Sequence, residues 1–107
     1  MSTLLVLSTA PSKEVATLLA KTLVEQHLAA CVSIQEGITS FFEWQGETAQ
    51  ESEVLLLIKT KESLFEALKT TLCTLHPYEV PEIIALEISK GHLPYLHWID
   101  SVTKDPV

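Results

Sequence analysis

The stretch LHPYEVPEII, from Leu75 to Ile84, decides where the second half of the chain changes from helix to strand. Its prolines, Pro77 and Pro81, fix their own φ angles and bias the preceding residues, His76 and Val80, toward extended conformations. A helix-period segment precedes the stretch and an apolar run follows it, so we expect the helix to end at about His76. Polar side chains on such a constrained loop often belong to binding sites. The alternative is a plain helix-to-strand junction with solvated side chains.

The segment before this stretch has the pattern of an amphipathic helix. Its leucines recur at helical spacing and predict one core-facing stripe, and the residues of that stripe are Leu64, Leu68, Leu72 and Leu75. Thr60 or Ser63 is a suitable N-cap for this helix, because a hydroxyl can accept a bond from a free backbone N–H of the first turn.

The other elements are predicted from apolar periodicity and from the turn residues. Gly37 permits a turn or a bulge, and Gln45–Thr48 is a turn candidate that joins two strands into a hairpin. Tyr95, Leu96, Trp98 and Ile99 are expected to form the packing face of a short last helix that starts near Pro94. The expected strands are Thr3–Ser8, Ala30–Ile34, Ser40–Trp44, Glu53–Lys59 and Ile83–Ile88, and a helix is expected at Lys13–His27 with Ser12 as its N-cap.

This order predicts an α+β fold of a single domain over residues 1–107. It is the ferredoxin-like β-α-β-β-α-β arrangement with a short C-terminal helix, in which two helices cover one face of an antiparallel sheet. Leu4–Leu7 and Leu55–Ile58 are apolar on both alternation phases, so the second sheet face also needs a cover. We therefore expect the chain to oligomerise through its sheet, with the hairpin around Ser40–Trp44 as the contact.

Composition excludes several function classes. The net charge of −7 disfavours binding to nucleic acid or to an anionic membrane, because both need clusters of Lys or Arg. No apolar window approaches the roughly 20 residues that span a bilayer. The N-terminal apolar run lacks the basic segment of a signal peptide. The two cysteines form no CxxC motif, so a reducing, cytoplasmic location is expected.

Several segments along nearly the whole chain resemble the CutA divalent-cation-tolerance family. They are VLSTAP at Val6–Pro11, LAACVSI at Leu28–Ile34, ITSFFEWQG at Ile38–Gly46, EVLLLIKT at Glu53–Thr60, HPYEVPEII at His76–Ile84 and YLHWI at Tyr95–Ile99. The resemblance implies a ferredoxin-like protomer assembled into a tight homotrimer. It also implies a link to tolerance of divalent metals, copper in particular, and a likeness to the trimeric PII signalling proteins.

The metal-binding residues of the family carry over unevenly. In its copper-binding members a thiol occupies the position of Ser8, and two histidines precede the PY pair where this chain has Leu75 and His76. Only His76 remains as a metal ligand, for copper or another divalent cation. Copper(I) favours thiolate and copper(II) suits an imidazole pair, and Ser8 and Leu75 offer neither. A shell around His76 would need trimer symmetry or another neighbouring ligand.

The resemblance also implies clefts between subunits, around which a small or anionic ligand could bind. The cleft candidates are Cys31, Trp44, Lys59, Tyr78, Glu82 and Trp98. Lys59 needs a carboxylate partner at a covered sheet edge, and Glu53, Glu82 or a carboxylate of another chain could supply it. Glu51 and Glu53, at i and i+2, have the pattern of an exposed strand face. The alternatives are that Cys31 is an inert core thiol and that the cleft residues only hold the trimer together.

Two functions remain open. The first is a homotrimeric, PII-like divalent-cation tolerance module that binds a metal or a small effector without catalysis; no GxSxG, P-loop or GxGxxG motif is present. The second is an oligomeric scaffold that presents a surface to a partner protein. An RNA-binding module shares the topology, but the chain lacks its signature motif and is acidic, so we set that function aside.

Overall fold

Seven regular elements and one short 3₁₀ turn make up the chain in a computed structural model that describes residues 2–105. Their order is the predicted β-α-β-β-α-β, followed by a third helix. The elements are β1 (Thr3–Ala10), α1 (Lys13–Glu25), β2 (Cys31–Trp44), β3 (Glu47–Lys61), η1 (Glu62–Leu64), α2 (Phe65–Leu75), β4 (Ile84–Glu87) and α3 (Leu93–Val102).

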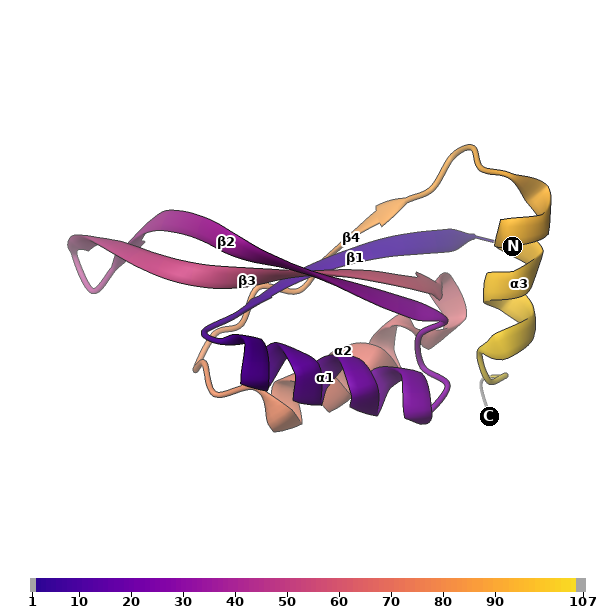
Figure 1. Cartoon of the computed structure of the whole chain (residues 1–107), viewed down its shortest axis with the longest axis horizontal. Helices are drawn as coiled ribbons and strands as arrows, with labels where there is room; N and C mark the ends of the chain where they lie inside the picture. Colours follow the sequence, from indigo (N-terminus) through magenta and orange to yellow (C-terminus); the bar gives the residue numbers. More distant parts are fainter. Residues whose placement is uncertain (1, 106–107) are drawn as a thin grey trace.

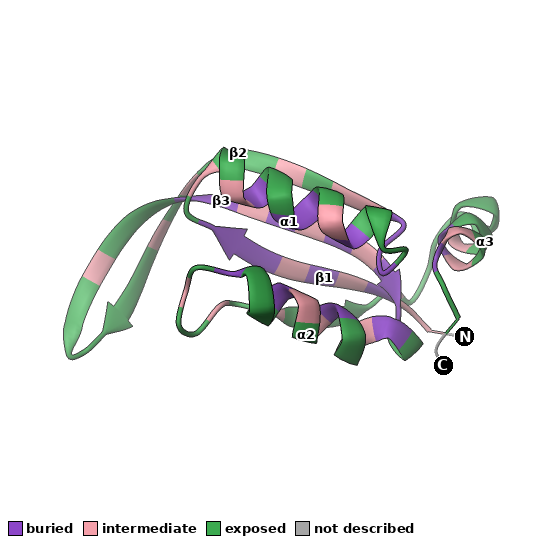
Figure 2. Ribbon diagram, turned by 90° about the horizontal axis from the view of Figure 1, so that it is seen from below, coloured by how far each residue is buried: buried purple, intermediate pink, exposed green. Residues whose placement is uncertain are grey.

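The four strands form one antiparallel sheet in the order β2-β3-β1-β4. The first three strands along the sheet are long, whereas β4 at the edge has only four residues. Figure 1 shows α1 and α2 side by side against the same face of this sheet. Seen from the helix side in Figure 2, their buried surfaces point at the central strands β1 and β3.

Helix α1 begins and packs as its sequence predicts. The hydroxyl of Ser12 accepts a hydrogen bond from the backbone N–H of Val15 at 3.2 Å, which caps the first turn. Leu19 and Leu23 are fully buried on its core face. The predicted end at His27 is two residues too late, because the helix closes at Glu25.

The predicted start of α2 is wrong. Thr60 lies in β3, where its hydroxyl donates to the carbonyl of Leu28 at 2.6 Å and is fully buried. The helix follows η1 and has Leu64 at its N-cap without a side-chain hydrogen bond, so Ser63 does not cap it either. The stripe is buried as far as Leu72, but Leu75 is exposed at the end of the helix.

Strands β2 and β3 form a much longer hairpin than the periodicity predicts. The strands expected at Ala30–Ile34 and Ser40–Trp44 are one strand, interrupted between Gln35 and Ile38 by a bulge where Gly37 has φ +81°. The turn has only two residues outside the strands, Gln45 and Gly46, both with positive φ as a tight hairpin requires. The outer half of the hairpin extends beyond the helices as a two-stranded arm (Figure 1).

The sheet has one covered and one uncovered face. The alternating residues that face α1 and α2, among them Val6, Leu56 and Ile58, are fully buried. The opposite alternation places six apolar side chains, from three neighbouring strands, on the uncovered face, and they are only partly buried or exposed. We call these residues the apolar sheet face: Leu5, Leu7, Leu55, Leu57, Ile84 and Leu86. They confirm the expectation that the second face is apolar, and no element among residues 2–105 covers it.

Helix α3 lies beyond the end of the sheet, beside the start of β1 (Figure 1). Of its predicted packing residues only Ile99 is buried, while Tyr95 and Trp98 are exposed. The ammonium group of Lys61, itself buried, lies 3.2 Å from a carboxylate oxygen of Asp100 and ties the helix to β3. The helix therefore packs through an ion pair and one isoleucine rather than through an aromatic face.

Candidate functional site

The loop after α2 is fastened to β1 by His76. As predicted, the helix ends before this residue, which has extended φ and ψ angles of −74° and 136°. The backbone N–H of Tyr78 donates to Nδ1 of His76 at 3.1 Å. Nε2 therefore carries the proton and donates to the carbonyl oxygen of Thr9 at 2.7 Å. His76 is only 8% exposed, and its buried hydrogen bond to Thr9 holds the loop against the strand, while the bond from Tyr78 lies within the loop.

Tyr78 continues this connection toward the hairpin. Its ring packs on that of His76 with centroids 4.7 Å apart, and its hydroxyl donates to Oε2 of Glu53 at 2.7 Å. Burial, followed by the hydrogen bond to the Glu53 carboxylate, raises the pKa of the Tyr78 phenol well above its usual value. The phenol is therefore a stable donor to that carboxylate throughout the physiological pH range.

A groove of about 930 Å³ lies between this loop and the hairpin arm. Its walls combine four aromatic rings with four carboxylates, and no Lys, Arg or His belongs to them. We call it the hairpin groove, and its lining residues are Thr9, Pro11, Ser40, Phe41, Phe42, Trp44, Ala49, Glu51, Ser52, Glu53, Pro77, Tyr78, Glu79, Val80, Pro81 and Glu82.

The cleft candidates lie on three different parts of the single chain. Trp44, Tyr78 and Glu82 line the hairpin groove together. Cys31 and Lys59 lie at the opposite end of the paired strands β2 and β3 from the turn, in register with each other. The sixth candidate is on α3, where the rings of Trp98 and Tyr95 are 5.6 Å apart.

Lys59 has a different partner from the one expected within the chain. Its ammonium donates to the hydroxyl of Ser33 at 2.8 Å and to the sulfur of Cys31 at 3.7 Å. Among residues 2–105 it forms no salt bridge, so neither Glu53 nor Glu82 of the same chain is its partner, and pairing with a carboxylate of another chain stays a prediction. Burial, and then Cys31, raise the pKa of the Tyr95 phenol.

His76 fits a copper site poorly in this arrangement. Both ring nitrogens take part in hydrogen bonds, so neither offers a free lone pair for a metal. Ser8 is buried and its hydroxyl has no hydrogen-bond partner among the described residues, and Leu75 contributes no donor atom. Within residues 2–105 no group of three or more His, Cys, Asp or Glu side chains is arranged to hold a metal ion.

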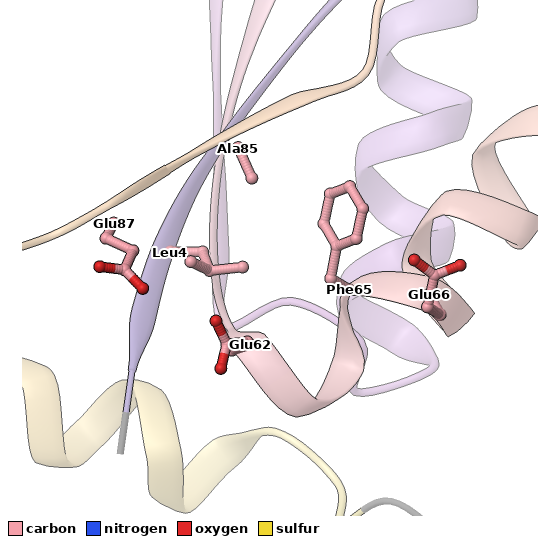
Figure 3. Close-up of a pocket in the computed structure, with 6 residues that line it drawn as sticks. All are labelled: Leu4, Glu62, Phe65, Glu66, Ala85 and Glu87. Atoms are coloured by element: carbon pink, nitrogen blue, oxygen red, sulfur yellow. The ribbon is translucent and has the colours of Figure 1, made fainter.

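A second cleft, of about 420 Å³, lies where η1 and the start of α2 meet β1 and β4. Figure 3 shows its carboxylates Glu62, Glu66 and Glu87 set apart around Leu4 and Phe65. Glu66 already forms an ion pair with Lys69 at 2.8 Å. None of the predicted site residues lies here, and the separated carboxylates form no common binding point.

Sequence reasoning missed Glu53 as a site residue. The spacing of Glu51 and Glu53 indicates an exposed strand face, which is correct for Glu51. Glu53 is only 8% exposed, because the loop that carries Tyr78 folds over it. Phe41, Ser33 and Tyr95 were also missed. Phe41 would have been the easiest of the three to find, since it belongs to the same aromatic segment of the hairpin as Trp44.

The fold and the groove define a small α+β protein whose candidate site is acidic and aromatic. Among the described residues, no helix is long and apolar enough to cross a membrane. The family model "CutA1 divalent ion tolerance protein" matches residues 4–102. The chain belongs to this family.

Relatives and solved structures agree with the assignment. The divalent-cation tolerance protein CutA of Thermus thermophilus is 53% identical over 94 residues, which are 88% of this chain and 91% of the relative. Protein CutA of Mus musculus is 48% identical over 90% of this chain, but the match spans only 54% of the mouse protein. A crystal structure of CutA1 from Oryza sativa superposes with a TM-score of 0.96 at 42% identity, over 98% of this chain and 96% of the rice chain.

Proposed function

We propose that the chain acts as a homotrimer of ferredoxin-like protomers, a PII-like module for divalent-cation tolerance that binds a metal or a small effector without catalysis. The apolar sheet face is the observation that carries the proposal. Ile84 and Leu86 are 52% and 50% exposed, and they continue across β1 into Leu5 and Leu7. Complete burial of a leucine contributes about 1.5–3 kcal/mol, so covering this face with further copies strongly favours association.

The hairpin arm and Lys59 support the same assembly. The arm exposes Phe41, Phe42 and Trp44, which are the kinds of side chain that form interface anchors. Lys59 lies at the edge of the apolar sheet face without a carboxylate partner among the described residues, and a carboxylate of another copy would supply one. Closed symmetric assemblies bury such self-complementary surfaces without forming open fibres.

The effector role is supported by the hairpin groove and by the family's relation to divalent ions. Copper at His76 requires Nε2 to leave the Thr9 carbonyl, which makes binding at this residue weak and dependent on further ligands. The proposed subunit-cleft residues are the groove residues Trp44, Tyr78 and Glu82, together with Cys31, Lys59 and Trp98. We place the protein in the cytoplasm, where its free thiols Cys31 and Cys73 would stay reduced.

Sedimentation of the metal-free chain tests this proposal, repeated with copper and with bound metal measured in the same fractions. The expected mass is about three times that of the 11.9 kDa chain. Leu57→Glu on the apolar sheet face should reduce the mass toward one chain, whereas Leu18→Glu on the solvent side of α1 should leave it unchanged. A folded wild-type particle of one chain at micromolar concentration would refute the assembly.

A second candidate function is an oligomeric scaffold that presents the hairpin arm to a partner protein. The exposed Phe41, 66% accessible near the tip of the arm, favours it. In this case Phe41→Ser should abolish capture of a stoichiometric partner without changing the mass of the oligomer. Loss of the oligomer itself in this variant would assign the ring to self-association instead.

A further inference from the structure

We propose that the hairpin groove binds an organic cation, namely an ammonium or guanidinium group on an apolar stem, and that Glu53 is its charge partner. The inference rests on the effector-binding role proposed above and specifies the chemical class of the effector. The site is separate from His76, which fits copper poorly and does not line the groove.

The carboxylate of Glu53 is the first reason. Glu53 as a whole residue is 8% exposed, yet its carboxylate forms no salt bridge with any residue from 2 to 105. Its one described donor is the neutral hydroxyl of Tyr78, on Oε2. A buried carboxylate loses its hydration and is strongly stabilised by a cation that reaches it. The groove gives such a cation access, because Glu53 is one of its lining residues.

The aromatic walls are the second, independent reason. Phe41, Trp44 and Tyr78 line the same groove as the carboxylate. Aromatic faces attract organic cations and also pack against an alkyl stem. A hydrated divalent metal gains little from such walls, and it needs several converging oxygen ligands, which are absent among the described residues.

The size and charge of the groove agree with this ligand class. Its volume of about 930 Å³ lies within the range of small-molecule sites. Glu51, Glu79 and Glu82 surround the entrance with negative charge, and no basic side chain in the lining competes for Glu53. An anionic effector would be repelled, and a neutral one would leave the Glu53 carboxylate without a cationic partner.

Calorimetry on the full chain tests the proposal with three probes: pentylamine, agmatine and the neutral pentanol. Both cations should bind and pentanol should not, since it differs from pentylamine only in the charged group. In a Trp98→Phe background, Trp44 is the remaining tryptophan and its fluorescence should change on binding. Equal binding of pentanol and pentylamine would overturn the role of charge.

Matched variants separate Glu53 from general acidity. Glu53→Gln keeps an acceptor for the Tyr78 hydroxyl and should weaken cation binding by about tenfold or more. Glu25→Gln, an exposed position on α1, changes the net charge equally and should leave the affinity unchanged. Unaltered affinity in Glu53→Gln would refute the proposal.

Two further outcomes distinguish the sources of the cation. If Glu53→Gln lowers the mass of the oligomer and the free amines do not bind, the cation is a lysine of a second copy, and the small-molecule proposal is wrong. If the wild-type chain is monomeric but binds the amines through Glu53, the trimer fails and this inference stands.

Discussion

At the scale of single residues, His76 illustrates how hydrogen bonds decide between two roles for one side chain. A histidine before a PY pair suggests a metal ligand, but here one nitrogen accepts from the backbone of Tyr78 and the other donates to Thr9. The same imidazole cannot keep both bonds and coordinate an ion. Its structural role therefore competes directly with metal binding.

His76→Ala should destabilise the fold by about 1–3 kcal/mol, because the carbonyl of Thr9 loses its buried donor. Any weak binding of Cu(II) should decrease in the same variant. Urea unfolding and copper calorimetry measure the two effects, with His97→Ala on the exposed side of α3 as the control. A variant of unchanged stability would show that the hydrogen bond from His76 to Thr9 does not hold the loop.

The raised pKa of Tyr78 makes a prediction at alkaline pH. The folded state prefers the neutral phenol, so its pKa exceeds that of the unfolded chain. The contribution of Tyr78 to stability is fully present below about pH 10 and is lost as the pH rises above it toward the folded pKa. Tyr78→Phe should flatten this alkaline decline, measured by urea unfolding between pH 8 and 11.

Ultraviolet titration of the folded chain gives the matching control. Burial and Cys31 also raise the pKa of Tyr95, the second tyrosine, so both phenols should ionise late. Tyr95→Phe isolates the Tyr78 signal. Ionisation of Tyr78 near pH 10 in the folded protein would contradict the buried hydrogen bond to Glu53.

At the scale of elements, periodicity predicted the existence of every strand and helix but not the length of the hairpin. Apart from Ala49 the segment Glu47–Ser52 is polar, because the arm lies beyond the helices and carries no apolar alternation that would predict a strand. By contrast, the buried side of α1 leaves apolar residues at helical spacing, so that helix was predicted almost completely. The cap at Thr60 was mispredicted because the carbonyl of Leu28, far away in sequence, takes its hydroxyl.

The site was predicted in part for a similar reason. Trp44, Tyr78 and Glu82 come from distinctive segments of the sequence, and they line one groove. The pairing of Tyr78 with Glu53 joins residues 25 positions apart and depends on how the loop folds over the sheet. No local pattern contains that contact, so the buried carboxylate was mistaken for an exposed one.

The arm also provides a test at this scale. Trp44 is 44% exposed in the single chain. Its replacement by alanine should lower the stability of the oligomer by up to about 4 kcal/mol if other copies cover the ring. Sedimentation and melting at several protein concentrations measure the effect, with Leu18→Ala as the control. An unchanged melting temperature would show that the ring stays in solvent.

At the scale of the whole molecule, the two sides of the sheet have different roles. One side is closed by α1 and α2 and supplies a core that a single chain can fold around (Figure 2). The other side stays apolar, carries Lys59 and Cys31 at its edge, and is the surface proposed for association. Leu57→Glu therefore separates folding from assembly, because the substitution lies outside the helix-covered core.

The projecting arm has a consequence for backbone protection. A two-stranded ribbon without a packed face is only marginally stable in water. The backbone amides between Phe41 and Gln50 pair only with each other across the ribbon. In separated copies, these amides should exchange with deuterium much faster than the amides of Val6 or Ile58 in the centre of the sheet. On assembly the same amides should slow as neighbouring copies clamp the ribbon, so deuterium uptake at the arm reports the subunit equilibrium directly.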